Sequence, residues 1–293
     1  MLSLLASLLL VELDWVHSLV GEGAEMGHNK VSSFSPPVSG CGTPSYSPLT
    51  RVVNGVDANP HSWPWQVSLQ YLKGEKYDHI CGASLISQDW VLTAGHCISK
   101  SLSYQVVLGE HDFSVEEGSE QVIPILTEDI FVHPGWNPYC IACGNDVALM
   151  KLSQKAQLND KVQLACLPPA GQILPHDTPC FVSGWGTLYT GGPLPDKLQQ
   201  AQLPVVDHAH CSHQDWWGND IKESMICAGG DIRSACNGDS GGPLNCRGSD
   251  GRWYIQGIAS FVYGEGCNTL KKPTVFTRDS AFVSWIEETM ANN

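Results

Sequence analysis

The stretch Cys236-Asn237-Gly238-Asp239-Ser240-Gly241-Gly242-Pro243 places a serine between glycines, directly after an aspartate. Glycines allow positive φ angles and let the backbone come close to a substrate carbonyl. In such a turn the N–H groups of Gly238 and Ser240 can point together at a developing oxyanion. A glycine-rich surface turn between strands has a similar composition. The stretch therefore indicates a nucleophilic serine if a base and an orienting acid lie elsewhere in the chain.

Two upstream segments offer these groups. The run Val91-Leu-Thr-Ala-Gly-His96-Cys97 ends an apolar segment on a histidine. A neutral imidazole near pH 7 is the best general base for a serine hydroxyl, although a purely structural histidine fits the same position. The run Gly144-Asn145-Asp146-Val-Ala-Leu149 leads an aspartate into an apolar segment. Because an unpaired buried carboxylate is costly, Asp146 needs a partner, and His96 is the candidate.

The composition limits the possible classes of protein. The 293 residues, 42% of them hydrophobic, suffice for one large domain or two small ones. A net charge of -14 argues against nucleic acid as a partner, because a phosphate-binding surface needs an excess of Lys and Arg.

The N-terminus favours export. Residues 2–11 are apolar over the length of a signal-peptide core and are far too few to span a bilayer. No basic residue precedes them, and Glu12 and Asp14 interrupt the run, so residues 1–40 are interpreted as an atypical signal or N-terminal segment. We expect a secreted, extracellular protein that does not have a membrane as a partner.

Short strands separated by turns are expected from residue 52 onward. They mix β-branched, aromatic and alternating polar residues, and Gly, Pro, Asn or Asp separates them. This pattern favours an all-β barrel or sandwich. A helix is expected near the C-terminus, because apolar residues of 282–290 fall on one face, with Asp279 or Ser280 as its N-cap. The expected strands include 65–71, 104–108, 147–152, 180–183 and 253–258.

Twelve cysteines indicate a disulfide framework formed in an oxidising compartment. Zinc is the competing interpretation, because Cys140-x-x-Cys143 has ligand-like spacing and three histidines between 208 and 213 flank Cys211. Neither cluster is completed by a second Cys-x-x-Cys or His-x-x-x-His, which disfavours zinc. A redox role for Cys140-x-x-Cys143 lacks a thioredoxin-like βαβ context.

The chain resembles the chymotrypsin-like serine protease family over about residues 41–293, and its order of His96, Asp146 and Ser240 matches that family. The resemblance implies an all-β fold of two packed antiparallel β-barrels, about 66–155 and 173–278, with a C-terminal helix at about 280–290. The motifs that carry it are Arg51-Val-Val-Asn-Gly55, Ser62-Trp-Pro-Trp-Gln66, Thr93-Ala-Gly-His-Cys97, Asp146-Val-Ala-Leu149, Gly184-Trp-Gly186 and Gly238-Asp-Ser-Gly-Gly242.

The same resemblance implies the catalytic roles. Ser240 attacks the scissile carbonyl, His96 takes and returns the proton, and Asp146 orients the imidazole. The N–H groups of Gly238 and Ser240 form the oxyanion hole. A serine endopeptidase of this kind needs no cofactor for catalysis.

An activation switch is implied as well. Residues 41–51 correspond to an activation propeptide and 52–293 to the peptidase domain. Cleavage after Arg51 frees the amino group of Val52, which in this family folds inward and pairs with the aspartate before the serine, here Asp239. Pairing of this kind raises the pKa of an α-amino group above its ordinary range.

Matching positions in the family also imply a complete set of disulfides. Cys41 would tether the cleaved propeptide to the catalytic domain, and Cys140 and Cys143 would form a local bridge. The implied pairs are Cys41–Cys166, Cys81–Cys97, Cys140–Cys143, Cys180–Cys246, Cys211–Cys227 and Cys236–Cys267.

The substrate preference follows from the specificity pocket that the resemblance implies. Ser234 is expected at its floor, where a trypsin-like enzyme needs an aspartate. Ser260, Val262 and Thr274 are expected in its walls, and the last two narrow it where glycines would leave room. The pocket resembles that of the elastases, and the chain is most similar to the pancreatic elastase III (proteinase E) type. We expect cleavage after small apolar residues such as Ala.

A structural calcium site is a further expectation. Glu110, Glu117 and Glu120, with the carbonyls of Asp112 and Val115, match the calcium loop of pancreatic proteases. Ca²⁺ takes oxygen ligands of this kind. A solvated acidic hairpin explains the same residues equally well.

The expected partners are polypeptide substrates, an activating trypsin-like protease and protein protease inhibitors. The alternative function is a catalytically silent protein of the same fold that binds a procarboxypeptidase. That reading predicts damage to the catalytic residues, to the oxyanion glycines or to Arg51-Val52, all of which the sequence retains.

Overall fold

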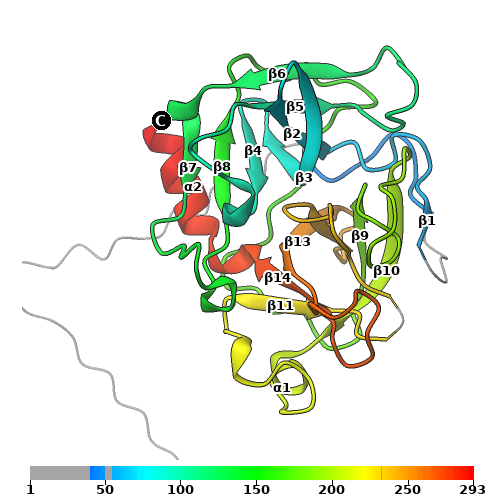
Figure 1. Ribbon diagram of the computed structural model, residues 1–293, viewed down its shortest axis with the longest axis vertical. Coiled ribbons are helices and arrows are strands. Elements are labelled where there is room, and N and C mark those ends of the chain that lie inside the picture. Colours follow the sequence, from blue (N-terminus) through cyan, green and yellow to red (C-terminus); the bar gives the residue numbers. More distant parts are fainter. Residues whose placement is uncertain (1–39, 50–54, 232) are drawn as a thin grey trace, which may run out of the picture. The chain divides into compact units, whose positions relative to one another are not determined.

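The computed structural model describes residues 40–49, 55–231 and 233–293. They form two antiparallel seven-stranded sheets, which confirms the predicted all-β fold of two barrels (Figure 1). The predicted signal segment and the Arg51-Val52 bond lie outside the described residues.

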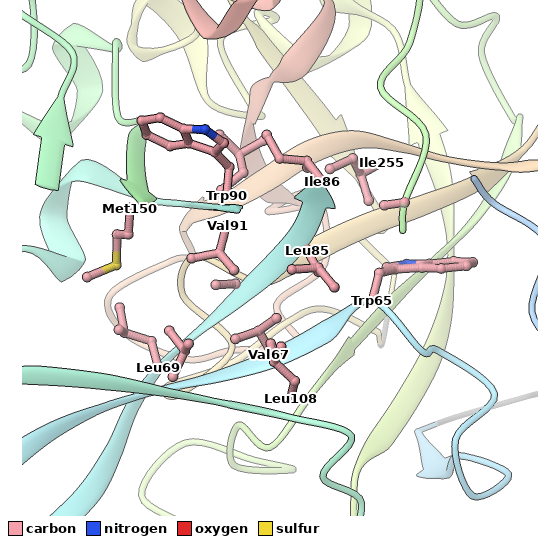
Figure 2. Close-up of a cluster of buried hydrophobic side chains, with 14 of the residues drawn as sticks. Trp65, Val67, Leu69, Leu85, Ile86, Trp90, Val91, Leu108, Met150 and Ile255 are labelled. Carbon is pink, nitrogen blue, oxygen red and sulfur yellow. The ribbon is translucent and has the colours of Figure 1, made fainter. Parts of the chain in front are cut away.

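The first sheet curls around a core of large apolar side chains, and its strand order is β6-β5-β2-β3-β4-β8-β7. Trp65, just before β2, and Val67 and Leu69 within it are fully buried in this core (Figure 2). The intervening Gln66 and Ser68 are buried too, so this part of β2 is covered on both faces. Its strands are β2 (Gln66–Lys73), β3 (Lys76–Ser87), β4 (Trp90–Thr93), β5 (Tyr104–Leu108), β6 (Gln121–Ile125), β7 (Ile130–Val132) and β8 (Ala148–Lys151).

The second sheet closes on itself, because β9 pairs with both β12 and β10. Closure leaves no free edge among the six strands β9 to β14. The short β1 joins them, because Val56 pairs with Gln200. Its strands are β1 (Val56–Asp57), β9 (Pro179–Gly184), β10 (Gln199–Val206), β11 (Met225–Ala228), β12 (Pro243–Arg247), β13 (Trp253–Phe261) and β14 (Thr274–Arg278).

The described residues also form two α-helices, α1 (His208–Cys211) and α2 (Val283–Asn292), and short 3₁₀ turns. The prediction that Asp279 or Ser280 caps the C-terminal helix is wrong. A 3₁₀ turn over Asp279–Ala281 comes first, so α2 has Phe282 at its N-cap without a side-chain hydrogen bond. No helix of the described residues is both long and apolar enough to cross a membrane.

All twelve cysteines lie in described residues and form disulfides. Because Cys140 bonds to Cys143 and Cys211 to Cys227, none of these sulfurs is available as the zinc ligand that the sequence left open. The six pairs are Cys41–Cys166, Cys81–Cys97, Cys140–Cys143, Cys180–Cys246, Cys211–Cys227 and Cys236–Cys267.

Candidate active site

His96 and Asp146 meet at one end of the first sheet, where β4 ends and β8 begins. His96 lies in the 3₁₀ turn Gly95–Cys97 that follows β4, and Asp146 lies just before β8, the strand that pairs with β4. The carboxylate of Asp146 accepts from the backbone N–H of His96 at 2.8 Å and from its Nδ1 at 2.7 Å. Since a carboxylate only accepts, Nδ1 must carry the proton, which leaves the lone pair on Nε2.

The second sheet fixes the other side of Asp146. The Ser260 hydroxyl at the end of β13 donates to Asp146 Oδ2 at 2.5 Å, and the Thr277 hydroxyl in β14 donates to its main-chain oxygen at 2.8 Å. The Asp146 side chain is almost fully buried, so these donors compensate its desolvation. The sequence placed Ser260 only in the pocket wall and gave no signal for Thr277 in this role.

Ser240 stands in the turn before β12, beside both sheets. Its main-chain oxygen accepts from Gly82 of β3 at 2.7 Å, and the next residue, Gly241, donates to Ala259 of β13 at 2.8 Å. Ser240 shares the lining of one cavity with Ser260, which is bonded to Asp146. The turn is thus held by both sheets at the place where Asp146 is held.

The peptide groups before Gly238 and Ser240 have fixed directions. The carbonyl of Asn237 accepts from the Thr187 N–H at 2.8 Å, and the carbonyl of Asp239 accepts from the Gly242 N–H at 2.9 Å. In a trans peptide the N–H points opposite to the carbonyl. Within the described part of the chain, neither the Gly238 N–H nor the Ser240 N–H has an acceptor. Both donors are therefore available to an oxyanion.

His79 in β3 bonds to this turn, and nothing in the sequence predicted that contact. Its Nε2 bonds to the Gly238 carbonyl at 3.2 Å, and its Nδ1 bonds to the Ser68 hydroxyl at 2.8 Å. Burial lowers the pKa of His79 to about 4, so the ring is neutral at pH 7. A neutral ring has one N–H, which must be at Nε2 because the carbonyl accepts; the Ser68 hydroxyl then donates to Nδ1.

Asp239 is buried among backbone groups of the second barrel. Its carboxyl accepts from the backbone N–H groups of Gly186 and Cys236, both at 2.9 Å. Burial raises its pKa to about 6, against the opposing effect of these two donors. A Cβ at Gly184 or Gly186 would collide with this carboxyl, so the Gly184-Trp-Gly186 motif makes room for it.

Beside Asp239 lies a cavity of about 300 Å³. Gly55, Gly184 and Gly186 contribute to its lining, together with Asp239 itself. In the described part of the chain, no cationic side chain bonds to the carboxyl. Asp239 and Gly55, the first described residue of the peptidase segment, therefore line the same cavity.

A second, smaller cavity of about 210 Å³ adjoins Ser240. Ser260, Val262 and Thr274 contribute to its lining, as do Ala235, Cys236, Asn237, Ala259 and Phe261. The Thr274 hydroxyl accepts from the Ala235 N–H at 2.8 Å. Ser234 lies outside this lining and borders the larger cavity instead. Its hydroxyl bonds to the Ala235 carbonyl at 2.8 Å and to Asn268.

The acidic loop brings three of the predicted calcium ligands together. One carboxylate oxygen each of Glu110, Glu117 and Glu120 lies within 4.8 Å of the others. Burial, with smaller effects of the other two glutamates, raises the pKa of Glu110 to about 7. The main-chain oxygen of Asp112, a further predicted ligand, accepts a hydrogen bond from the Val115 N–H at 3.1 Å. The three carboxylates fit a hard cation, which would relieve their mutual repulsion.

Comparison with known proteins identifies the family. The trypsin family model matches residues 52–286. The chain is 67% identical to human chymotrypsin-like elastase family member 3B over 255 residues, which are 87% of this chain and 94% of that protein. It is 68% identical to bovine proproteinase E over 260 residues (89% and 100%) and 52% identical to bovine chymotrypsin-C over 266 residues (90% and 98%). The chain belongs to the trypsin family and is an elastase-like serine endopeptidase.

Proposed function

We propose that this chain is a secreted zymogen which, after cleavage behind Arg51, hydrolyses peptide bonds that follow small apolar residues such as Ala. The observation that carries the proposal is the pair of hydrogen bonds from His96 to the buried Asp146, next to the cavity that Ser240 lines. A base with a defined tautomer, linked through Asp146 and Ser260 to the cavity that Ser240 lines, supports this proposal.

The chemistry assigned to each group follows from its bonding. With Nδ1–H held by Asp146, the Nε2 lone pair of His96 accepts the Ser240 proton as the hydroxyl attacks the scissile carbonyl. The resulting imidazolium is stabilised by the Asp146 carboxylate, and its Nε2–H then protonates the leaving amine. Water then attacks the carbonyl of the acyl-enzyme, again with His96 as the general base, and Ser240 is released. Thr277 is a positioning residue, because it acts on Asp146, and Ser260 both holds Asp146 and lines the cavity proposed for the substrate side chain.

The fixed N–H groups of Gly238 and Ser240 support the oxyanion role. They cost no reorganisation when the carbonyl oxygen becomes negative, because other backbone donors already hold the adjacent carbonyls. Removal of a single such donor costs about 10²–10³ in turnover in a comparable protease. His79 helps to hold the turn through the Gly238 carbonyl.

The cavity beside Asp239 supports the activation switch. A buried carboxyl with a pKa near 6 is unfavourable as an anion, and an ammonium group in the cavity would offset that cost. Val52 lies three residues before Gly55, which borders the cavity, so the new amino group is within reach of it. An ordinary α-amino pKa is about 7.7–8.0, and pairing with Asp239 would raise it.

The small cavity supports the substrate preference. Val262 and Thr274 both line it, and among the residues that the structure describes no acidic side chain does, so neither a basic nor a large aromatic side chain has a matching site there. The hydroxyl of Thr274 is occupied by the Ala235 N–H, which keeps the residue in the wall. Small apolar side chains fit this space.

Secretion and the remaining partners are part of the same proposal. Six disulfides fit an oxidising compartment, and the printed name of bovine proproteinase E denotes a precursor form. A cation such as Ca²⁺ at Glu110, Glu117 and Glu120 would be structural, because these residues take no part in the proposed catalysis. Polypeptide substrates, a trypsin-like activator and protein inhibitors are the proposed partners.

Tryptic activation of the purified full chain tests the function. Amide substrates ending in Ala, Phe or Arg would be compared after activation, with Ser240→Ala as the matched inactive control. We expect cleavage after Ala, and a loss on the order of 10⁶ in turnover in the control. Cleavage mainly after Arg would refute the pocket assignment. Complete absence of cleavage by the activated wild type would favour a silent binding protein.

A further inference from the structure

A cluster of two histidines and an aspartate lies at the end of the second barrel that carries α1, outside the catalytic site (Figure 1). His176 precedes β9, Asp207 follows β10, and His210 belongs to α1. One ligand atom of each lies within 4.8 Å of the others. Their side chains are about one third to three fifths exposed, which leaves the cluster open to solvent.

The imidazole Nδ1 atoms of both histidines face the same carboxylate. His210 Nδ1 lies 2.7 Å from Asp207 Oδ1, and His176 Nδ1 lies 3.9 Å from Asp207 Oδ2. The two rings stack with centroids 4.6 Å apart and planes 14° apart. The Asp207 N–H donates to His176 Nδ1 at 3.3 Å, so that nitrogen carries no proton, and a bound ion would have to replace this long hydrogen bond at its lone pair.

The far nitrogen of His176 has a carboxylate beside it. Nε2 lies 3.6 Å from Asp177 Oδ1, while Nδ1 faces Asp207. Histidines that ligate a metal through one nitrogen commonly give the other N–H to a carboxylate, which fixes the tautomer and raises ligand basicity. At 3.6 Å the separation is longer than a hydrogen bond, so Asp177 is a nearby partner for the His176 Nε2–H if a metal occupies Nδ1, and not a bond already formed.

The backbone holds the three residues in place. The segment around His176 is fastened to β10 by a bond from the Asp177 N–H to the Val205 carbonyl at 2.8 Å, and by one from the Val205 N–H to the Thr178 carbonyl at 3.0 Å. Asp207 accepts from the His210 N–H at 2.8 Å, and the Cys211–Cys227 disulfide ties α1 to β11. Binding would therefore require little ordering of the chain.

We propose that His176, Asp207 and His210 form a binding site for a divalent transition metal, with Zn²⁺ as the ion of first choice. Imidazole nitrogen and carboxylate oxygen are ordinary zinc ligands, whereas Ca²⁺ and Mg²⁺ prefer oxygen alone. To ligate the ion through Nδ1, the neutral His210 ring would carry its proton on Nε2 instead of Nδ1, and at least one coordination position would be left to water. It would link the segment before β9 to α1 and stabilise the folded chain without taking part in peptide hydrolysis.

The test measures Zn²⁺ binding to the full chain by calorimetry and by the shift in melting temperature, in a His96→Ala background with excess Ca²⁺. The background removes the catalytic imidazole, and Ca²⁺ competes for the three glutamates. We expect one zinc ion per chain. His176→Ala and His210→Ala should each weaken binding about tenfold or more, and Asp177→Asn should weaken it less. His208→Ala is the matched control, because His208 is an exposed neighbour on α1 outside the cluster.

Three results would overturn the site: no zinc binding by the parent, unchanged affinity in both His176→Ala and His210→Ala, or an equal loss in His208→Ala. Circular dichroism of each metal-free variant separates loss of a ligand from loss of the fold. His210→Asn replaces His210→Ala if the latter is unfolded.

Discussion

Asp279 provides a direct test of the packing between the second barrel and α2. Its side chain is fully buried, and in the described part of the chain neither carboxyl oxygen has a hydrogen-bond partner. Burial raises the pKa of this carboxyl well above its ordinary value. The Val side chain has a volume similar to that of Asp and lacks both carboxyl oxygens. We therefore expect Asp279→Val to stabilise the fold.

The magnitude has two parts. A buried neutral carboxyl without a partner costs about 1–3 kcal/mol relative to an apolar group. The second part depends on pH. Because the folded-state pKa is raised, the folded chain holds the proton more tightly than the unfolded chain does. Below the unfolded pKa of about 3.9 there is no ionisation penalty. Above it, the free energy of unfolding falls by about 1.4 kcal/mol per pH unit until the folded-state pKa is reached.

Urea unfolding with the disulfides intact measures this difference at several pH values from 4 to 8, in a Ser240→Ala background that prevents self-digestion. The increase in the free energy of unfolding that Asp279→Val gives should be smallest at pH 4 and should become larger as the pH rises. Asp239 and Glu110 also titrate with raised pKa values, but they are present in both proteins and cancel in the difference. Asp279→Asn should show no such pH dependence relative to Asp279→Val, because neither residue ionises.

Glu287→Gln on the exposed face of α2 is the matched control and should give a difference close to zero at every pH. A gain from Asp279→Val that does not change with pH would show that the carboxyl titrates normally. A loss of stability at every pH would show that Asp279 has a partner or a solvated environment. Either result would refute the inference from burial.

Three further predictions concern the proposed zymogen. Arg51→Gln should leave a folded protein that trypsin neither cleaves at this position nor activates; activity equal to wild type after trypsin treatment would contradict the switch. Glu110→Gln should abolish the rise in melting temperature that Ca²⁺ gives to the wild type, and an unchanged rise would exclude Glu110 as a ligand. The double variant Val262→Gly, Thr274→Gly should raise the ratio of kcat/KM for Phe over Ala substrates by about tenfold or more, and an unchanged ratio would place specificity elsewhere.

Much of the candidate site could be predicted from the sequence because its chemistry is local. Gly238 to Gly242 requires glycines for a tight turn, and His96 and Asp146 each stand at the end of an apolar run, so the residue types mark the positions. Strand segments were recognised by alternation, and β5 spans the predicted 104–108. These signals need only a few neighbouring residues.

Contacts between distant segments could not be predicted in the same way. Ser260 donates to Asp146 across 114 residues, and His79 bonds to the Gly238 carbonyl across 159. Nothing in the sequence near Ser260 or His79 indicates these partners. The same applies to His176. The sequence suggested zinc binding only by the histidines near Cys211 together, whereas the structure places His210 close to His176, which precedes β9. Closure of the second sheet places β9 beside β10 and so creates that cluster.

The failed N-cap prediction at Asp279 has a physical cause. An aspartate caps a helix only if its side chain reaches an N–H of the first turn. Here the Asp279 main-chain carbonyl accepts from Phe282, and the resulting 3₁₀ turn delays the start of α2 until Val283. The side chain is directed into the protein, where Phe282 and Ile286 are also buried. Its burial is therefore imposed by the packing of α2 against the barrels, against the preference of the residue itself, and Asp279→Val measures what that conflict costs.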